Sequence, residues 1–176
     1  MVLVAAMSRL LPHPPNFTAV GATALFGAAY FTKKYWAFLI PFLALWISDL
    51  ILNNVVYGAY FEGFTFFSEF MIWNYIAFGL MILLGSQVLK KIKPMNLLGV
   101  SLGASAIFFL VTNFGTWYVD FANIYPDNFA GLMAAYAAGL PYFLNTIVGD
   151  LFYVGVLFGA FELVKQRYPN LAIGNV

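Results

Sequence analysis

Asp150 is the residue whose type and setting most clearly point to chemistry. It lies about 13 Å along the apolar segment 141–164, with Thr146 one turn before it and Tyr153 about one turn after it on the same face. Asn145 flanks that face. Ionisable side chains inside apolar segments are costly and tend to mark function. The carboxylate can contact a ligand or an ion, or it can be a structural group hydrogen-bonded to a neighbouring helix.

Further polar side chains have the spacing of residues that line one cavity. Thr112-Asn113 and Thr116-Trp117 repeat after four residues, so two polar stripes run along one helix. Small-molecule sites combine aromatic and apolar walls with a few placed polar groups. Each tryptophan has an alternative role as an anchor at the membrane interface. The candidate cavity residues on helices are Trp73, Asn74, Asn113, Trp117, Asn145 and Asp150.

Arg9 stands apart from the other cations and must be paired. A guanidinium suits a carboxylate or a phosphate. Its partner is therefore an aspartate, such as Asp49, or an anionic group of a substrate, and the sequence leaves both open. The proline-rich loop that follows adds His13, which can cover the cavity or bond within its own loop. Asn16 of the same loop completes the candidate ligand-binding set.

The elements that position these residues have the composition of a membrane protein. The chain is 63% hydrophobic and 9% charged, with 20 phenylalanines, whereas a soluble domain is about half apolar and about a quarter charged. With no cysteine and one histidine, we expect no disulfide, thiolate, zinc or iron–sulfur chemistry and no cofactor. The net charge of +1 excludes a nucleic-acid partner. The lipid bilayer is the expected solvent.

Hydropathy divides the chain into helices. A spanning helix needs roughly 20 apolar residues. Four apolar segments have about that length, and two others, 2–11 and 20–31, are shorter. The first of them reaches only about 16 Å, so either it is a half-helix or Met1 is not the native start. Between 120 and 140 we expect a separate short helix that dips along or into the outer face. The four long segments are 35–52, 70–89, 95–119 and 141–164.

The charge pattern predicts an orientation. Cations cluster at 33–34, at 90–93 and at 165–167, and the loops between them carry only acidic charges. By the positive-inside rule the three clusters share the cytoplasmic side. We therefore expect an all-α, polytopic membrane bundle of about six transmembrane helices. It forms a single domain, 1–176, in a bacterial inner membrane with both termini inside.

Several runs of sequence are similar to a family of small bacterial integral membrane proteins of unknown function. The resemblance covers nearly the whole chain and names no substrate. The runs that carry it are 9–18 (RLLPHPPNFT) with the following helix, 112–115 (TNFG) with Trp117, 138–141 (AGLP) and 145–150 (NTIVGD).

The layout also resembles, at the level of architecture, the substrate-binding S components of energy-coupling factor vitamin transporters. In S components the vitamin lies in an outward cavity made by the last three helices and the outer loops. Small-residue faces on the early helices dock on an energising transmembrane subunit with ATPases. The resemblance implies that Ala24 and Ala28 could supply such a face.

The leading hypothesis is a membrane-embedded binding and translocation subunit for uptake of a small metabolite, such as a vitamin or its precursor. The alternatives are a non-transport scaffold subunit of a larger complex and a solitary ion-coupled carrier. An enzyme is not expected, because the sequence has no serine–base pair at helical spacing and no metal cluster. It has no Gly-rich nucleotide-binding loop either. Energy for active transport must then come from another chain or from an ion gradient.

Overall fold

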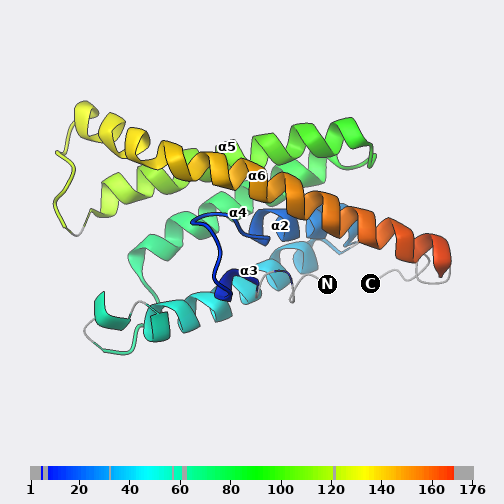
Figure 1. The fold of residues 1–176 in the computed structure, drawn as a ribbon, viewed down its shortest axis with the longest axis horizontal. Coiled ribbons are helices and arrows are strands. Elements are labelled where there is room, and N and C mark those ends of the chain that lie inside the picture. The colour runs from blue at the N-terminus through cyan, green and yellow to red at the C-terminus, as the bar shows by residue number, and fades with distance from the viewer. Residues whose placement is uncertain are drawn as a thin grey trace.

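The computed structural model describes residues 5, 8–31, 33–56, 58–60, 63–120 and 122–168. Within these ranges every regular element is helical and there is no strand, which confirms the all-α class (Figure 1). Three short helical turns accompany five α-helices. The elements are η1 (Ser8–Leu10), α2 (Val20–Tyr30), α3 (Lys34–Ile51), η2 (Leu52–Val56), η3 (Gly58–Tyr60), α4 (Glu69–Val88), α5 (Pro94–Val119) and α6 (Phe129–Arg167).

The long helices turn apolar side chains outward. On α3, Leu39, Leu43 and Ile47 are exposed at a spacing of four residues, and on α6 the same spacing exposes Val148 and Phe152. Such stripes would aggregate in water. Among the described residues, the four spans long and apolar enough to cross a membrane are Tyr35–Val56, Glu69–Val88, Pro94–Val119 and Phe129–Arg167. These apolar helices indicate a membrane protein.

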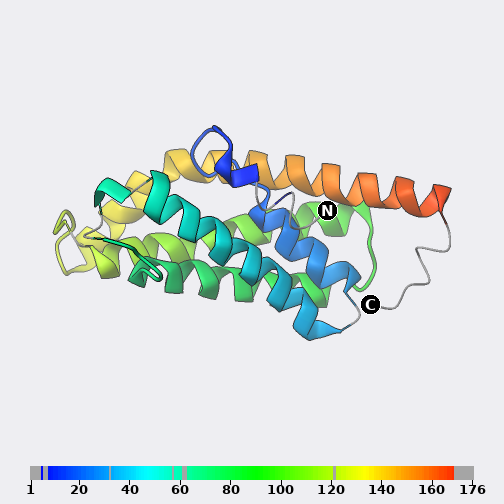
Figure 2. The ribbon, with the colours of Figure 1, turned by 90° about the horizontal axis from the view of Figure 1, so that it is seen from below.

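α2 is a short apolar helix at the centre of the bundle. Its 11 residues reach about 16 Å, roughly half of a bilayer core. Figures 1 and 2 show it between α3 and α6, and it also contacts α4 and α5. A Cβ on Gly85 of α4 would lie 3.0 Å from the Cβ of Ala28, so this glycine permits the close approach of α2 and α4. α2 therefore fills one half of the bundle and leaves the other half without a central helix.

The expectation of about six transmembrane helices is not confirmed. In the part of the chain that the structure describes there are four helices of spanning length and the shorter α2. Half of the predicted first segment, 2–11, lies outside the described residues, and the described half consists of Ala5, the turn Ser8–Leu10 and Leu11. The other predicted boundaries agree with α2, α3, α4 and α5 to within one or two residues.

The region before Pro141 differs from the prediction. Instead of a separate short helix followed by a new helix at 141, α6 runs without interruption from Phe129 to Arg167 with Pro141 inside it. Asn128 caps its start by accepting a hydrogen bond from the Gly131 N–H at 3.1 Å. The following alanine-rich run has high helix propensity, so the loss of one backbone hydrogen bond at the proline does not end the helix.

The cations of the three clusters gather at one end of the bundle. Lys33 lies at the α2–α3 junction, residues 90–93 form the α4–α5 turn, and Lys165 and Arg167 lie in the last turn of α6. All three places are on the same side of Figure 1. We call this the basic end. The opposite end, which carries the α3–α4 and α5–α6 connections, is the loop end.

Candidate functional site

A cavity of about 460 Å³ lies between α4, α5 and α6, beside the N-terminal turn of α2. It occupies space that the short α2 leaves empty. Its volume is within the range of roughly 300–1,000 Å³ typical of small-molecule sites. Apolar walls come from Phe70, Phe78, Met81 and Phe108. The polar or charged lining residues are Arg9, Asn16, Thr18, Asn74, Thr112, Asn113, Thr116, Tyr125, Tyr142, Thr146 and Asp150.

Asp150 lies where three helices meet at the cavity wall. Its side chain is 3% exposed, and its Oδ2 accepts a hydrogen bond of 2.6 Å from the Ser105 hydroxyl of α5. Its Oδ1 lies against Gly21 in the first turn of α2, where any Cβ would overlap the carboxylate. Asp150 is thus both a lining group of the cavity and a contact between α6, α5 and α2.

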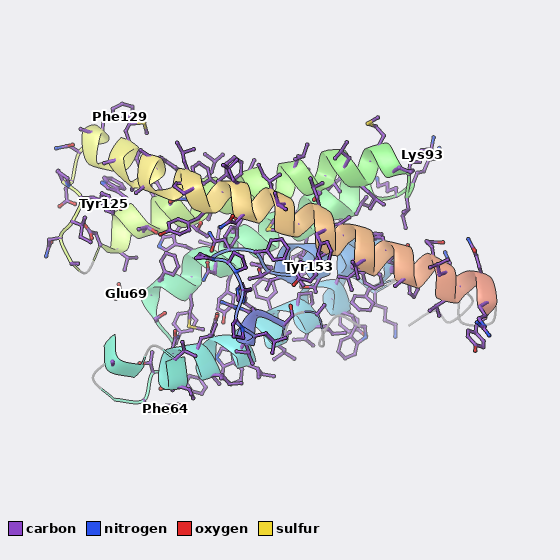
Figure 3. The ribbon with its side chains drawn as sticks, viewed as in Figure 1. Phe64, Glu69, Lys93, Tyr125, Phe129 and Tyr153 are labelled. Carbon is purple, nitrogen blue, oxygen red and sulfur yellow. The ribbon has the colours of Figure 1, made fainter. Side chains whose placement is uncertain are left out.

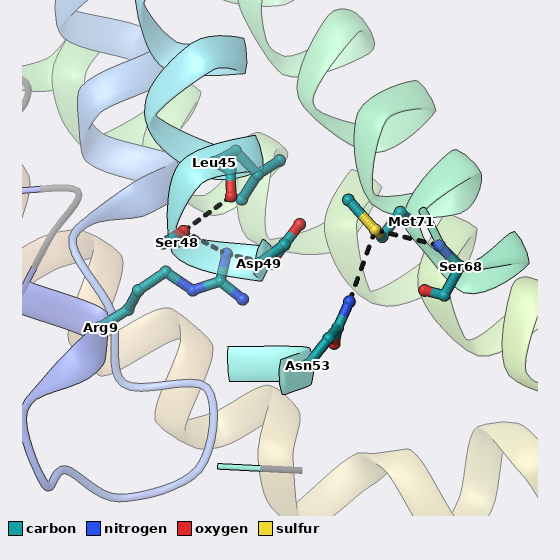
Figure 4. A network of polar contacts seen from close by, with 7 residues as sticks. All are labelled: Arg9, Leu45, Ser48, Asp49, Asn53, Ser68 and Met71. Atoms are coloured by element: carbon teal, nitrogen blue, oxygen red, sulfur yellow. Dashed lines mark hydrogen bonds and ion pairs between the residues drawn. The ribbon is translucent and has the colours of Figure 1, made fainter. Parts of the chain in front are cut away.

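Arg9 pairs with Asp49. Its Nη1 lies 2.7 Å from Asp49 Oδ1 and donates to the Ser48 hydroxyl at 3.1 Å, as Figure 4 shows. Asp49 is 4% exposed, and its Oδ2 has no hydrogen-bond partner among the residues described. The sequence left open whether Arg9 pairs with an aspartate or with a substrate, and the structure shows the pair with an aspartate. Arg9 also belongs to the cavity lining.

The segment 8–19, which we call the strap, crosses from α3 to α6 (Figure 1), and several of its residues line the cavity. The Arg9–Asp49 pair joins it to α3. At α6, the Asn145 side chain donates to the Pro15 carbonyl at 3.0 Å. Phe17 packs against the ring of Tyr153 with centroids 5.6 Å apart, and Figure 3 labels Tyr153 where α6 passes the strap.

Four of the predicted site residues have other contacts. Asn145 holds the strap, and His13 Nδ1 bonds to the Leu11 carbonyl in the same segment. Trp73 packs on Gly115 and against the Phe114 ring, and Trp117 Nε1 donates to the Pro126 carbonyl at 3.0 Å. These four side chains are not part of the cavity lining that the structure describes. The residues that do line it are Arg9, Asn16, Asn74, Asn113 and Asp150.

Sequence reasoning left several lining or supporting residues out of the candidate set. Thr112, Thr116 and Thr146 line the cavity, and their helical spacing from Asn113 and Asp150 is the signal that identifies them. Ser105, the partner of Asp150, carries no such signal, because many serines in apolar helices bond only to their own backbone.

Among the described residues, no three His, Cys, Asp or Glu side chains come together as a metal site would require. Groups able to hold a small molecule are therefore the amides, hydroxyls and single carboxylate of the cavity. The arrangement can bind and orient a ligand of modest size through hydrogen bonds and one negative charge.

A family model described as a family of unknown function (DUF6580) matches residues 1–171, and the chain belongs to that family. No curated protein and no solved structure matches the chain.

Proposed function

We propose that this DUF6580 protein binds a small, partly polar metabolite in the cavity between α4, α5 and α6 and serves its uptake across the membrane. The observation that carries the proposal is a cavity of about 460 Å³ lined by amides, hydroxyls and a carboxylate within a bundle of apolar helices. Polar groups inside membrane helices are costly and face a bundle interior or a cavity. A ligand that meets them offsets that cost.

The strap supports a capture role. It forms part of the cavity wall through Pro15, Asn16 and Thr18, and after the turn Ser8–Leu10 it has no regular secondary structure. Side-chain contacts such as Asn145 with the Pro15 carbonyl can break one at a time. The strap is therefore the part of the wall best suited to move when a ligand enters or leaves.

The finer proposal is a capture subunit that works like the S component of an energy-coupling factor transporter, with an energising transmembrane subunit and ATPases as partners. α2 would not supply the docking face in this protein. Ala24 is buried, and a Cβ on Gly85 of α4 would lie 3.0 Å from the Cβ of Ala28. A docking surface for such a partner would have to come from the outward faces of the long helices.

Native mass spectrometry of the protein, gently purified from its own membrane, tests the proposal. We expect a discrete co-purified mass in the metabolite range that is lost when Ala138, a lining residue, is replaced by Phe to fill the cavity. A co-purified ATPase would support the S-component form. Bare protein that still transports with an ion gradient would favour a solitary carrier, and a protein adduct without a ligand would favour a scaffold.

A further inference from the structure

Within the described part of the chain, the cavity is lined by two charged residues, of which one has a partner of opposite charge and the other does not. Among the described residues that line it, only Arg9 and Asp150 are charged. The positive charge of Arg9 is compensated by Asp49 at 2.7 Å. Across all the described residues the ion pairs are Arg9–Asp49 and Lys165–Glu162. Asp150 forms no ion pair there, and it accepts a hydrogen bond from the neutral Ser105 hydroxyl.

The first turn of α2 packs against Asp150 without supplying a charge. α2 has no side-chain cap, and the carboxylate lies against Gly21 in its first turn. The hydrogen bond that the structure shows at the Asp150 carboxylate comes from the Ser105 hydroxyl, which is neutral. A cation that reaches the carboxylate would therefore be its first charged partner, since Asp150 forms no ion pair among the described residues.

Three threonine hydroxyls of the wall present only an acceptor atom to the cavity, and Thr146 is the one that lies a single turn from Asp150. Thr112, Thr116 and Thr146 each donate their hydroxyl hydrogen to the carbonyl four residues earlier, at 2.8, 3.0 and 2.9 Å. Asn113 donates one amide hydrogen to the Phe109 carbonyl at 2.8 Å. A hydroxyl whose only hydrogen is used in this way can only accept from a ligand. These three hydroxyls match ligand groups that donate hydrogen bonds.

The aromatic residues of the lining also favour a cationic ligand. Phe70, Phe78 and Phe108 line the cavity together with Tyr142. Aromatic faces attract cations, and more strongly where water is excluded.

From these observations we infer that the ligand is a small organic cation, a protonated amine or a similar N–H-rich group, whose charge lies against the Asp150 carboxylate. The inference rests on the proposed function, since it assigns a chemical class to the metabolite of that cavity. It assigns Asp150 the role of a counter-ion, and it assigns the hydroxyl oxygen of Thr146, one turn away, the role of an acceptor for an ammonium hydrogen.

Three probes with one ring and different charges test the inference on the intact protein. Tyramine carries an ammonium group, tyrosol a neutral hydroxyl and 4-hydroxyphenylacetate a carboxylate. Binding is measured by calorimetry and by the thermal shift of tryptophan fluorescence. We expect tyramine to bind at least about tenfold tighter than tyrosol, with the preference lost in Asp150→Asn. The matched control Glu162→Gln, which changes a carboxylate at the basic end, should keep it.

A second variant covers the case in which Asp150→Asn does not fold. Thr146→Val removes one acceptor oxygen with little change in shape, and we expect it to weaken tyramine several-fold and leave tyrosol unchanged. Equal losses for both probes would mean a structural effect and would contradict the inference.

The other outcomes separate this inference from the proposed function. Equal binding of the three probes, or preference for the carboxylate, would overturn the cation class and leave the binding cavity standing. The charge of a co-purified metabolite is a second test. A neutral or anionic metabolite would contradict the inference. No probe binding and no co-purified metabolite would overturn both.

Discussion

At the scale of single residues, glycines decide how close polar groups and helices can come. Gly21 lets the Asp150 carboxylate reach the first turn of α2, and Gly139 leaves room for the Asn113 amide, because in both places a Cβ would overlap the polar side chain. Gly115 makes room for the Trp73 ring in the same way. The cavity wall therefore depends on residues that have no side chain of their own.

Replacement of Gly21 by Ala tests this dependence. The added Cβ must displace Asp150, and we expect a loss of about 1–3 kcal/mol in unfolding free energy, as for overpacked interiors, together with a loss of ligand binding. Gly79→Ala is the matched control, because a Cβ there has no neighbour within 4 Å. Both are measured by reversible unfolding in mixed detergent. Equal stability of the two variants would contradict the close contact at Gly21.

The Arg9–Asp49 pair makes a second prediction at this scale. Asp49→Leu leaves a partly buried guanidinium without its partner, and we expect a loss of about 3–5 kcal/mol in unfolding free energy. The double variant Arg9→Met with Asp49→Leu should regain most of it, because no charge is then left unpaired. A double-mutant cycle measures the coupling. Additive losses would show that the pair seen at 2.7 Å contributes nothing.

At the scale of elements, α6 and the strap are the features that determine the shape of the cavity. The 39 residues of α6 reach about 58 Å, well beyond the roughly 30 Å of a bilayer core. Its N-terminal part, which includes Ala135 and Gly139, forms cavity wall. A break at Pro141 would separate that wall from Asp150 and change the site.

The continuity of α6 can be measured directly. The chain has no cysteine, so spin labels can be placed at Met133→Cys and Leu163→Cys, which are 42% and 66% exposed. A helix unbroken at Pro141 places these positions about 45 Å apart. Pulsed electron paramagnetic resonance should give a single narrow distribution of label-to-label distances near that value. A markedly shorter or bimodal distribution would mean that the helix is broken at the proline.

The elements also show which features a sequence can predict. Long apolar runs with charged ends correctly predicted α3, α4 and α5, because hydropathy and length are local properties of a sequence. The continuity of α6 was missed because Pro141 and the glycines near it are ordinary stop signals, and the Asn128 cap together with the alanine-rich run outweighs them. The short α2 was identified, yet its central place in the bundle depends on contacts with Gly85 that no local pattern encodes.

The candidate site shows the same division. A polar residue inside an apolar helix predicts a position that faces a cavity or the bundle interior. Three such residues, Asn74, Asn113 and Asp150, do line the cavity. Trp73 and Trp117 do not line it, because a tryptophan near a helix end fits packing and backbone bonding as well as it fits a ligand. The role of Asn145 depends on the Pro15 carbonyl of the strap, a contact between residues far apart in the sequence.

At the scale of the whole molecule, the separation of charge gives the bundle a direction. The cations of the clusters lie at the basic end, and the α3–α4 and α5–α6 connections lie at the other (Figure 1). The positive-inside rule then predicts that the basic end faces the cytoplasm. In that orientation the strap and the cavity lie in the outer half of the membrane, where a ligand from outside would enter.

Single cysteines in the cysteine-free chain test this orientation. Lys93→Cys reports on the basic end, and Asn123→Cys reports on the loop end. In intact cells we expect a membrane-impermeant maleimide to label position 123 and to leave position 93 unlabelled until the membrane is opened. Labelling in the reverse order would place the cavity on the cytoplasmic side and would favour export over uptake.

The central claim is that the cavity binds a small metabolite. A crystal structure of protein purified without added ligand and crystallised in lipid tests it most directly. The account predicts compact density for a small molecule in the cavity, with a donor group within hydrogen-bond distance of Asp150 and with Asn113 nearby. A cavity closed by movement of the strap or filled by the protein's own side chains, in protein that still supports uptake, would contradict it.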